Sequence, residues 1–145
     1  MSRIISYKNR MADSTVEKIN LSTNDGLTGY SIHKLELMPI DADEDVESVL
    51  KIFATDPGTA SNDINFAEST LLAAGVIRAG TGVSQPLTVT TVFENEKFNQ
   101  NIFVTLKGNS YTRDVNYYLE LKESKLSLDE QTVATLTNIR NTGSQ

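Results

Sequence analysis

The sequence predicts an all-β protein, an antiparallel β-sandwich of jelly-roll or immunoglobulin-like type with about seven or eight strands. The first observation is strict alternation over residues 115–122, where Val115, Tyr117, Leu119 and Leu121 form one face and Asn116, Tyr118, Glu120 and Lys122 the other. That period of two is typical of a strand with one buried face. The second observation is that similar stretches recur between turn-forming residues, and the third is that almost no helical pattern lies between them.

The first half of the chain contains three predicted strands. Residues 16–21 predict the first, and the turn Asn24-Asp25-Gly26 follows because these residues tolerate positive φ. Residues 29–38 predict the second, which Pro39 ends because proline cannot donate to a ladder. Residues 48–55 are apolar on both faces, which is typical of a central strand, and residues 56–58 form a turn.

The second half contains four more. Residues 71–79 are apolar on both faces and favour a strand, although residues 67–74 also fit a helix. Residues 87–94 place Leu87, Val89 and Phe93 in one phase. Residues 99–107 bring Ile102, Val104 and Leu106 to one face. Residues 108–110 begin a loop that predicts a hairpin with the strand at 115–122.

The two ends differ from the sandwich predicted over residues 13–126. Residues 1–12 are basic, and they are either an extended arm that docks on a neighbouring subunit or a first edge strand. Residues 127–145 predict a short helix and a tail. Ser127 and Glu130 fit a capping box, and an apolar stripe follows at Val133, Leu136 and Ile139. A last strand is the alternative for this segment.

Composition narrows the classes of function. The chain has 145 residues and 16.0 kDa, which predicts one domain. Its 13 Lys and Arg against 19 Asp and Glu give a net charge of −6, which argues against nucleic acid as a partner. No apolar run is long enough for a membrane span. The absence of cysteine excludes disulfides and thiolate chemistry and agrees with assembly in a reducing cytoplasm.

No catalytic or cofactor-binding residue is predicted, and we expect the protein not to be an enzyme. His33 is the single histidine, and alternation places it on the same side as Leu35 and Leu37. A structural role therefore suits it better than that of a catalytic base. No glycine-rich phosphate-binding motif is present.

The acidic segment at residues 41–47 is the one candidate for a metal. Asp41, Asp43 and Asp45 have the spacing of the first ligands of a helix–loop–helix calcium loop. The sixth position should be glycine and is Val46, and the twelfth should be glutamate and is Ile52, so that motif fails. A looser calcium site that includes Glu47 stays open beside the alternative of a solvated loop.

Candidate contact residues for a protein partner lie in two places. The basic N-terminal segment offers Arg3, Ile4, Ile5, Tyr7 and Arg10. Tyr30 and Tyr118 are candidates on outer faces of the sheets, since tyrosine is enriched at interfaces.

Three segments of the chain resemble a group of small virion structural proteins of tailed bacteriophages, especially marine ones. The segments are LSTNDGLTGY at 21–30, NYYLEL at 116–121 and VATLTNIRN at 133–141. They bracket most of the chain, and none of them is a catalytic signature. The resemblance implies a particle component without a defined chemistry, and it assigns no functional residues.

Together with one β-domain, an acidic net charge, no active-site constellation and a basic N-terminal segment, the resemblance leads us to expect a capsid decoration (cement) protein. Such a protein stabilises the head shell by bridging coat subunits, so its partners would be the major capsid protein or other virion proteins, and its own copies in a symmetric oligomer. Its location would be the virion, assembled in the cytoplasm of a host bacterium. A component of the tail, baseplate or head–tail connector is one alternative. A carbohydrate-binding or host-attachment module is another, from a different class.

Overall fold

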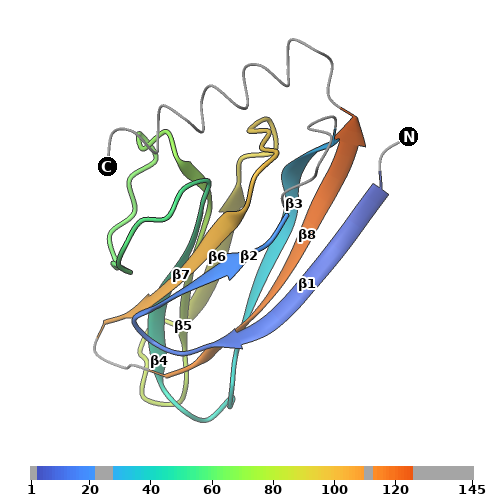
Figure 1. Cartoon of the computed structure of the whole chain (residues 1–145). Helices are drawn as coiled ribbons and strands as arrows, with labels where there is room; N and C mark the ends of the chain where they lie inside the picture. Colours follow the sequence, from blue (N-terminus) through green and yellow to red (C-terminus); the bar gives the residue numbers. More distant parts are fainter. Residues whose placement is uncertain (1–2, 22–27, 110–112, 126–145) are drawn as a thin grey trace.

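The computed structural model describes residues 3–21, 28–109 and 113–125, which form eight antiparallel strands in two sheets (Figure 1). The strands are β1 (Arg3–Met11), β2 (Thr15–Ile19), β3 (Thr28–Pro39), β4 (Val46–Phe53), β5 (Leu71–Ala79), β6 (Leu87–Val92), β7 (Ile102–Gly108) and β8 (Val115–Lys125). One sheet has the order β1-β8-β3 and the other β2-β7-β4-β5-β6. The predicted all-β sandwich is confirmed.

Every strand predicted from alternation has a counterpart in the structure. The hairpin predicted between residues 99–107 and 115–122 is wrong, because β7 pairs with β2 and β4 in the five-stranded sheet and β8 with β1 and β3 in the other. Residues 71–79 form β5 along their whole length, so the helical alternative for residues 67–74 is wrong. Strand β4 is the middle strand of the five-stranded sheet, as its two apolar faces predicted. The turn predicted at residues 24–26 and the C-terminal helix predicted from residue 127 lie outside the described residues.

The N-terminal segment is a first edge strand, the second of the two alternatives that the sequence left open. Residues 3–11 are β1, and they pair in register with β8 of the same chain, from Arg3 opposite Glu123 to Met11 opposite Val115. Strand β1 is therefore an edge strand of the three-stranded sheet, and the segment expected as an arm is part of the sandwich.

The core is formed by alternate residues that the two sheets turn toward each other. On β8, the inner face consists of Val115, Tyr117, Leu119 and Leu121, all of them buried. The five-stranded sheet contributes Leu50 and Ile52 of β4 and the inner residues of β7, which are Ile102, Val104 and Leu106. Full burial of each such aliphatic side chain is worth about 1.5–3 kcal/mol relative to exposure, so this shared core holds the layers together.

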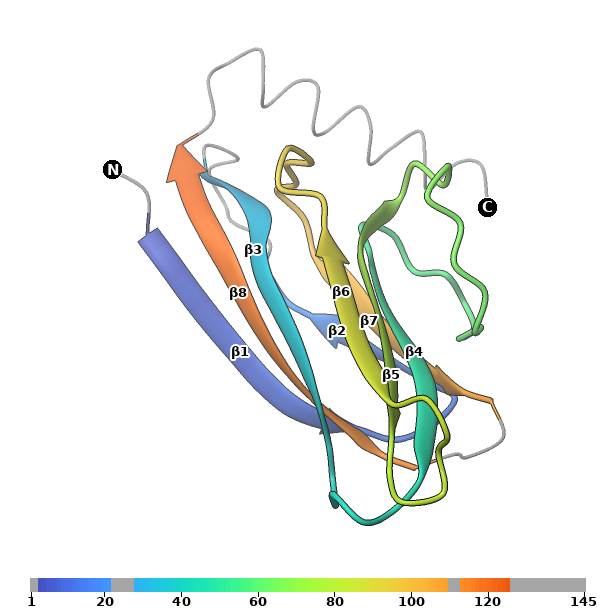
Figure 2. The same ribbon diagram turned by 180° about the vertical axis from the view of Figure 1, so that it is seen from behind.

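The sheets approach closely where β3 packs against β5 and β6, and Figure 2 shows β3 running beside β6. Gly75 on β5 makes this possible. A Cβ atom there would lie 2.8 Å from Leu37 Cδ1 and 3.1 Å from Thr90 Cγ2. The absence of a side chain at residue 75 therefore lets Leu37 enter the space between the sheets.

The alternation of β3 is interrupted at His33. The register with β8 shifts between Ile32 and Lys34, which indicates a β-bulge. Because of the extra residue, Ile32 and Leu35 are both buried while His33 is exposed. The prediction that His33 shares a face with Leu35 and Leu37 is therefore wrong.

The turn after β5 is fastened to the loop before β4. Asp45 Oδ1 accepts a hydrogen bond from the backbone N–H of Gly82 at 2.7 Å. Gly80 has φ of 111°, and a Cβ atom there would lie 2.5 Å from the Cα atom of Asp45. Gly80 is thus required both for its backbone conformation and for lack of space.

We predict that Gly80→Ala lowers the free energy of unfolding by at least about 2 kcal/mol, because the added methyl group meets backbone atoms that cannot rotate away. Denaturant unfolding followed by circular dichroism measures this. Gly58→Ala is the matched control, since Gly58 has φ of 82° but a Cβ atom added to it would meet no other atom within 4 Å. If both variants lost the same free energy of unfolding, the positive φ would explain the effect and the steric clash at Gly80 would contribute nothing.

Candidate interaction surface

The acidic segment does not form a cluster of metal ligands. Asp41 Oδ1 accepts the backbone N–H of Asp43 at 2.9 Å in a local turn. Asp45 holds the turn described above, and Glu47 lies 3.6 Å from Arg78 across the β4–β5 pair. Within residues 3–21, 28–109 and 113–125, no three His, Cys, Asp or Glu side chains are grouped to hold a metal ion. The carboxylates serve turns and an ion pair.

The two tyrosines predicted on outer faces lie in different places. Tyr30 is buried and stacks on Phe98, with ring centroids 6.1 Å apart, so its prediction as an outer residue is wrong. Tyr118 is half-buried on the outer face of β8, and its hydroxyl donates to Glu120 at 2.6 Å. His33 Nε2 lies 4.0 Å from the same carboxylate.

The N-terminal candidates divide between the two faces of β1. Ile5 and Tyr7 are partly buried and pack against the core, whereas Ile4 is 47% exposed on the outer face. The two arginines form ion pairs at the surface: Arg3 with Glu123 at 3.2 Å and Arg10 with Asp114 at 2.7 Å. Strand β1 carries three basic residues and no acidic one, and it is therefore a basic edge on an acidic protein.

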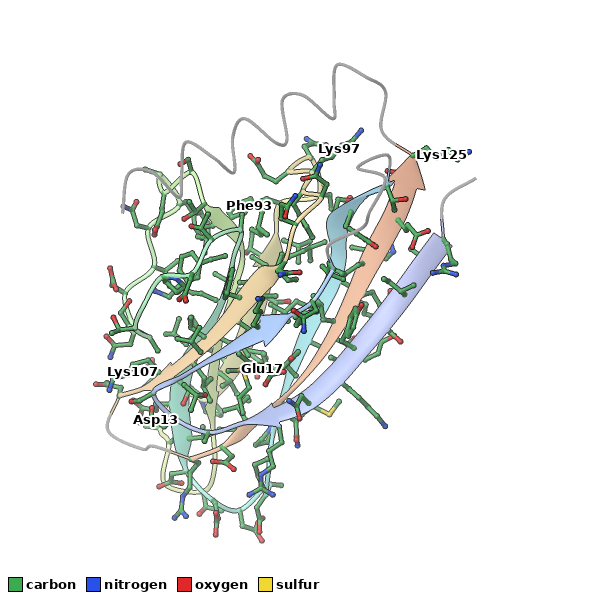
Figure 3. The ribbon with its side chains drawn as sticks, viewed as in Figure 1. Asp13, Glu17, Phe93, Lys97, Lys107 and Lys125 are labelled. Carbon is green, nitrogen blue, oxygen red and sulfur yellow. The ribbon has the colours of Figure 1, made fainter. Side chains whose placement is uncertain are left out.

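Strand β6 presents apolar side chains to solvent. Its register with β5 places Thr88, Thr90 and Val92 on the inner face and Leu87, Val89 and Thr91 on the outer face. Leu87 is 40% exposed and Val89 is 56% exposed. Phe93, labelled in Figure 3, continues the outer face and makes an edge-to-face contact with Phe66 at 5.2 Å between ring centroids. Phe66 itself is exposed, so an apolar strip runs along the outer side of β6.

The four edge strands carry different residues. Natural edge strands avoid unwanted pairing by means of charges, prolines, bulges or short length. Strand β1 has three basic residues, β2 is short and contains Glu17 and Lys18, and β3 contains charges, a bulge and Pro39. Strand β6 has no charge, no proline and no register shift within its bounds.

The sequence contained a signal for this strand. Residues 79–93 carry no charged side chain, although 22% of the chain is charged. Alternation correctly put Leu87, Val89 and Phe93 in one phase. It did not reveal that this phase is the outer one, because the pattern of a single strand does not say which face meets the core.

A different part of the same sheet is covered by residues 54–70. Lys51 extends from the outer face of β4, is 5% exposed, and donates through Nζ to Ser61 Oγ at 2.8 Å and to the backbone oxygen of Asp63 at 2.7 Å. The Ser61 hydroxyl and then the Lys51 charge lower the pKa of the Asp63 carboxyl below its ordinary value. The Lys51 ammonium also lies 5.4 Å from the ring centroid of Phe53. This buried cation fastens the segment to the sheet.

A hollow of about 370 Å³ lies beside this segment. Its lining residues are Glu47, Ser48, Val49, Asn62, Val76, Arg78, Lys107 and Asn109. Both cations there have partners within the chain: Arg78 lies 3.6 Å from Glu47, and Lys107 Nζ donates to Ser14 Oγ at 2.8 Å. The charges that line the hollow are therefore already engaged within the chain.

One carboxylate points inward between the sheets. Glu17, labelled in Figure 3, belongs to the inner face of β2. Its Oε1 accepts a hydrogen bond from the Tyr117 hydroxyl at 3.0 Å, and its Oε2 accepts one from the side-chain amide of Asn9 at 2.8 Å. Burial, followed by the Glu17 charge and hydrogen bond, raises the pKa of the Tyr117 phenol. The contact joins β2 to β8 and β1 across the layers.

Comparison with known proteins gives no family for the chain. No protein-family model matches it, and no curated protein matches it either. In the described part of the chain, no helix is long and apolar enough to cross a membrane.

We predict that Lys51→Met lowers the free energy of unfolding by about 2 kcal/mol, because hydrogen bonds from a charged donor are lost while the packing of the methylene stem is kept. Limited proteolysis should show faster cleavage within residues 54–70. Lys34→Met is the control, since Lys34 is exposed and pairs with Glu36 at 3.0 Å. Cleavage at the wild-type rate would contradict the role given to Lys51.

We predict that Tyr117→Phe changes how stability depends on alkaline pH. The pKa of the Tyr117 phenol is raised in the folded state above its ordinary value of 10.0. The contribution of Tyr117 to the free energy of unfolding is therefore complete below pH 10, and it is lost as the pH rises further. The wild type should therefore lose up to about 1.4 kcal/mol per pH unit more than the variant above pH 10.

Chemical denaturation at several pH values from 8 to about 11 tests this. At pH 8 the variant should be less stable by about 1–2 kcal/mol, the worth of its missing hydrogen bond. Parallel stability curves for the two proteins over the whole range would refute the pH dependence assigned to Tyr117.

Proposed function

We propose that this chain is a non-enzymatic structural protein of a tailed-bacteriophage virion, specifically a capsid decoration protein that stabilises the head shell by bridging coat subunits. The observation that carries the proposal is that, in the described part of the chain, two unlike strands on opposite sides of the sandwich each pair along one edge only. Strand β1 is a basic edge, and β6 is an uncharged edge with an apolar strip. Strand β3, which packs on β5 and β6, lies at the other end of its sheet from β1 (Figures 1 and 2).

Two unlike surfaces suit a bridging role. Each edge strand offers backbone hydrogen-bonding groups to a different partner, so one sandwich can link two neighbouring proteins. Many weak contacts, each repeated over a symmetric shell, hold collectively because every attached copy raises the effective concentration of the next contact. The resemblance of residues 21–30, 116–121 and 133–141 to virion proteins supports the same proposal.

The basic edge is the surface proposed to meet the coat. Lys8 is exposed on the outer face of β1, opposite Tyr118 of β8. Arg3 and Arg10 already pair with Glu123 and Asp114, so Lys8 is the cation of β1 proposed to attract an acidic surface. The partner proposed is therefore the major capsid protein, contacted in the virion after synthesis in the bacterial cytoplasm.

Particles of the virus whose genome encodes this sequence provide the test. Gel stoichiometry and cryo-electron microscopy should find the chain on the coat lattice in a number of copies that scales with the number of coat subunits. A few copies at the neck or tail would instead support the connector or tail alternative. Absence of the chain from purified particles would overturn the virion proposal.

Re-attachment to shells that lack the chain tests the contact itself. Lys8→Glu should bind such shells at least about tenfold more weakly than the wild type at physiological salt, because the reversed charge faces an acidic surface. Lys34→Glu is the matched control, a charge reversal on the outer face of the same sheet but at β3. Equal weakening by both substitutions would show that β1 is not the docking edge.

A further inference from the structure

The hydrogen-bonding groups along β6 divide between its two sides. Phe93, the residue after β6, donates its N–H to Leu72 O at 3.1 Å, toward β5. In an antiparallel pair, the residues that bond to one neighbour alternate with residues that direct N–H and C=O to the opposite side. Val89 and Thr91 therefore bond to β5, whereas Thr88, Thr90 and Val92 direct their backbone groups to the free edge. Among the described strands, only β5 pairs with β6.

We propose that this edge is a dimerisation site, at which β6 pairs antiparallel with β6 of a second copy around a two-fold axis at Thr90. The two five-stranded sheets then form one continuous sheet. The proposal concerns the chain by itself and does not depend on the virion function proposed above.

The side chains of β6 complement their own copies in this register. Thr90 meets Thr90 of the second copy, and Thr88 meets Val92, so the three residues with free backbone groups bond to one another. On the outer face, Val89 lies beside Thr91 of the second copy and Leu87 beside Phe93. The two exposed aliphatic residues of β6 are thereby covered, and cross-strand pairs of aromatic and aliphatic residues stabilise sheets.

Charge favours a second copy over an unrelated charged partner. Copies of a chain with net charge −6 repel each other wherever acidic surfaces meet. Residues 79–93 carry no charge, so pairing at β6 brings none from these residues into contact. Glu94, the first acidic residue beyond β6, falls opposite Pro86 of the second copy.

The mass of the purified full-length chain in solution is the first measurement. Analytical ultracentrifugation from about 1 to 200 µM, a range that covers ordinary dimer affinities, should show a species of twice 16.0 kDa. A monomer over the whole range would overturn the proposal. Such a result would leave the virion proposal standing, and absence from virions would likewise leave the dimer standing.

The substitution Val89→Lys tests whether β6 forms the dimer interface. Because Val89 is 56% exposed, the variant folds, and it places a cation in each copy near the axis. The dimer should dissociate at least about tenfold more readily. Met38→Lys is the control, since Met38 is 62% exposed on the outer face of the other sheet. A dimer equally stable in both variants would show that copies associate elsewhere.

Two substitutions at Thr90 test the register. Thr90→Pro removes an N–H from the free edge without removing a bond to β5, so it should abolish the dimer while circular dichroism stays that of the wild type. Thr90→Cys introduces the sole cysteine of the chain, at a site where the two Cα atoms of a hydrogen-bonded pair lie within disulfide range. Mild oxidation should cross-link it faster than Met38→Cys, and equal rates would refute the axis at Thr90.

Discussion

The constraint on which the structure depends is that a three-stranded sheet must share one core with a five-stranded sheet. The narrower sheet falls short by about two strand spacings, roughly 10 Å, so it cannot cover the whole inner face of the wider one. The edge strands of the wider sheet show the consequence. The inner face of β2 includes Thr15 and Glu17, and that of β6 includes Thr88 and Thr90. Polar residues therefore occupy inner positions where the apolar cover ends.

The two ends of the wider sheet meet this constraint in different ways. At β2, the inward carboxylate of Glu17 receives hydrogen bonds from Tyr117 and Asn9, so polar contacts join the layers where apolar ones stop. At β6, Thr88 belongs to the inner face and is nevertheless exposed, as are Leu87 and Val89 on the outer side. The first half of β6 is exposed on both faces, and no described strand pairs with its second edge, so β6 is incomplete as part of a sheet. This incompleteness is the physical basis for expecting a partner there.

Period-two alternation predicted most of the fold because each strand buries one face, as the pattern of β8 from Val115 to Leu121 shows. Three features were not predictable in this way. The bulge at His33 shifts the phase of β3, and alternation contains no signal for an extra residue. Tyr30 is buried because it stacks on Phe98, a residue distant in the sequence. The outer orientation of Leu87 and Val89 depends on the register with β5, which no single strand reveals.

The candidate surface follows from how little of the wider sheet remains available to a partner. On its outer face, Lys51 and Phe53 of β4 are buried, and the Lys51 ammonium binds Ser61 and Asp63 of the segment that crosses there. This cation cannot serve a partner without giving up those hydrogen bonds, and leaving a buried charge unpaired costs several kcal/mol. Strand β6 has no such commitment. Among the described strands only β5 pairs with β6, so a partner strand at its other edge gains backbone hydrogen bonds and covers apolar area without displacing a paired strand. The edge is therefore favoured over the face.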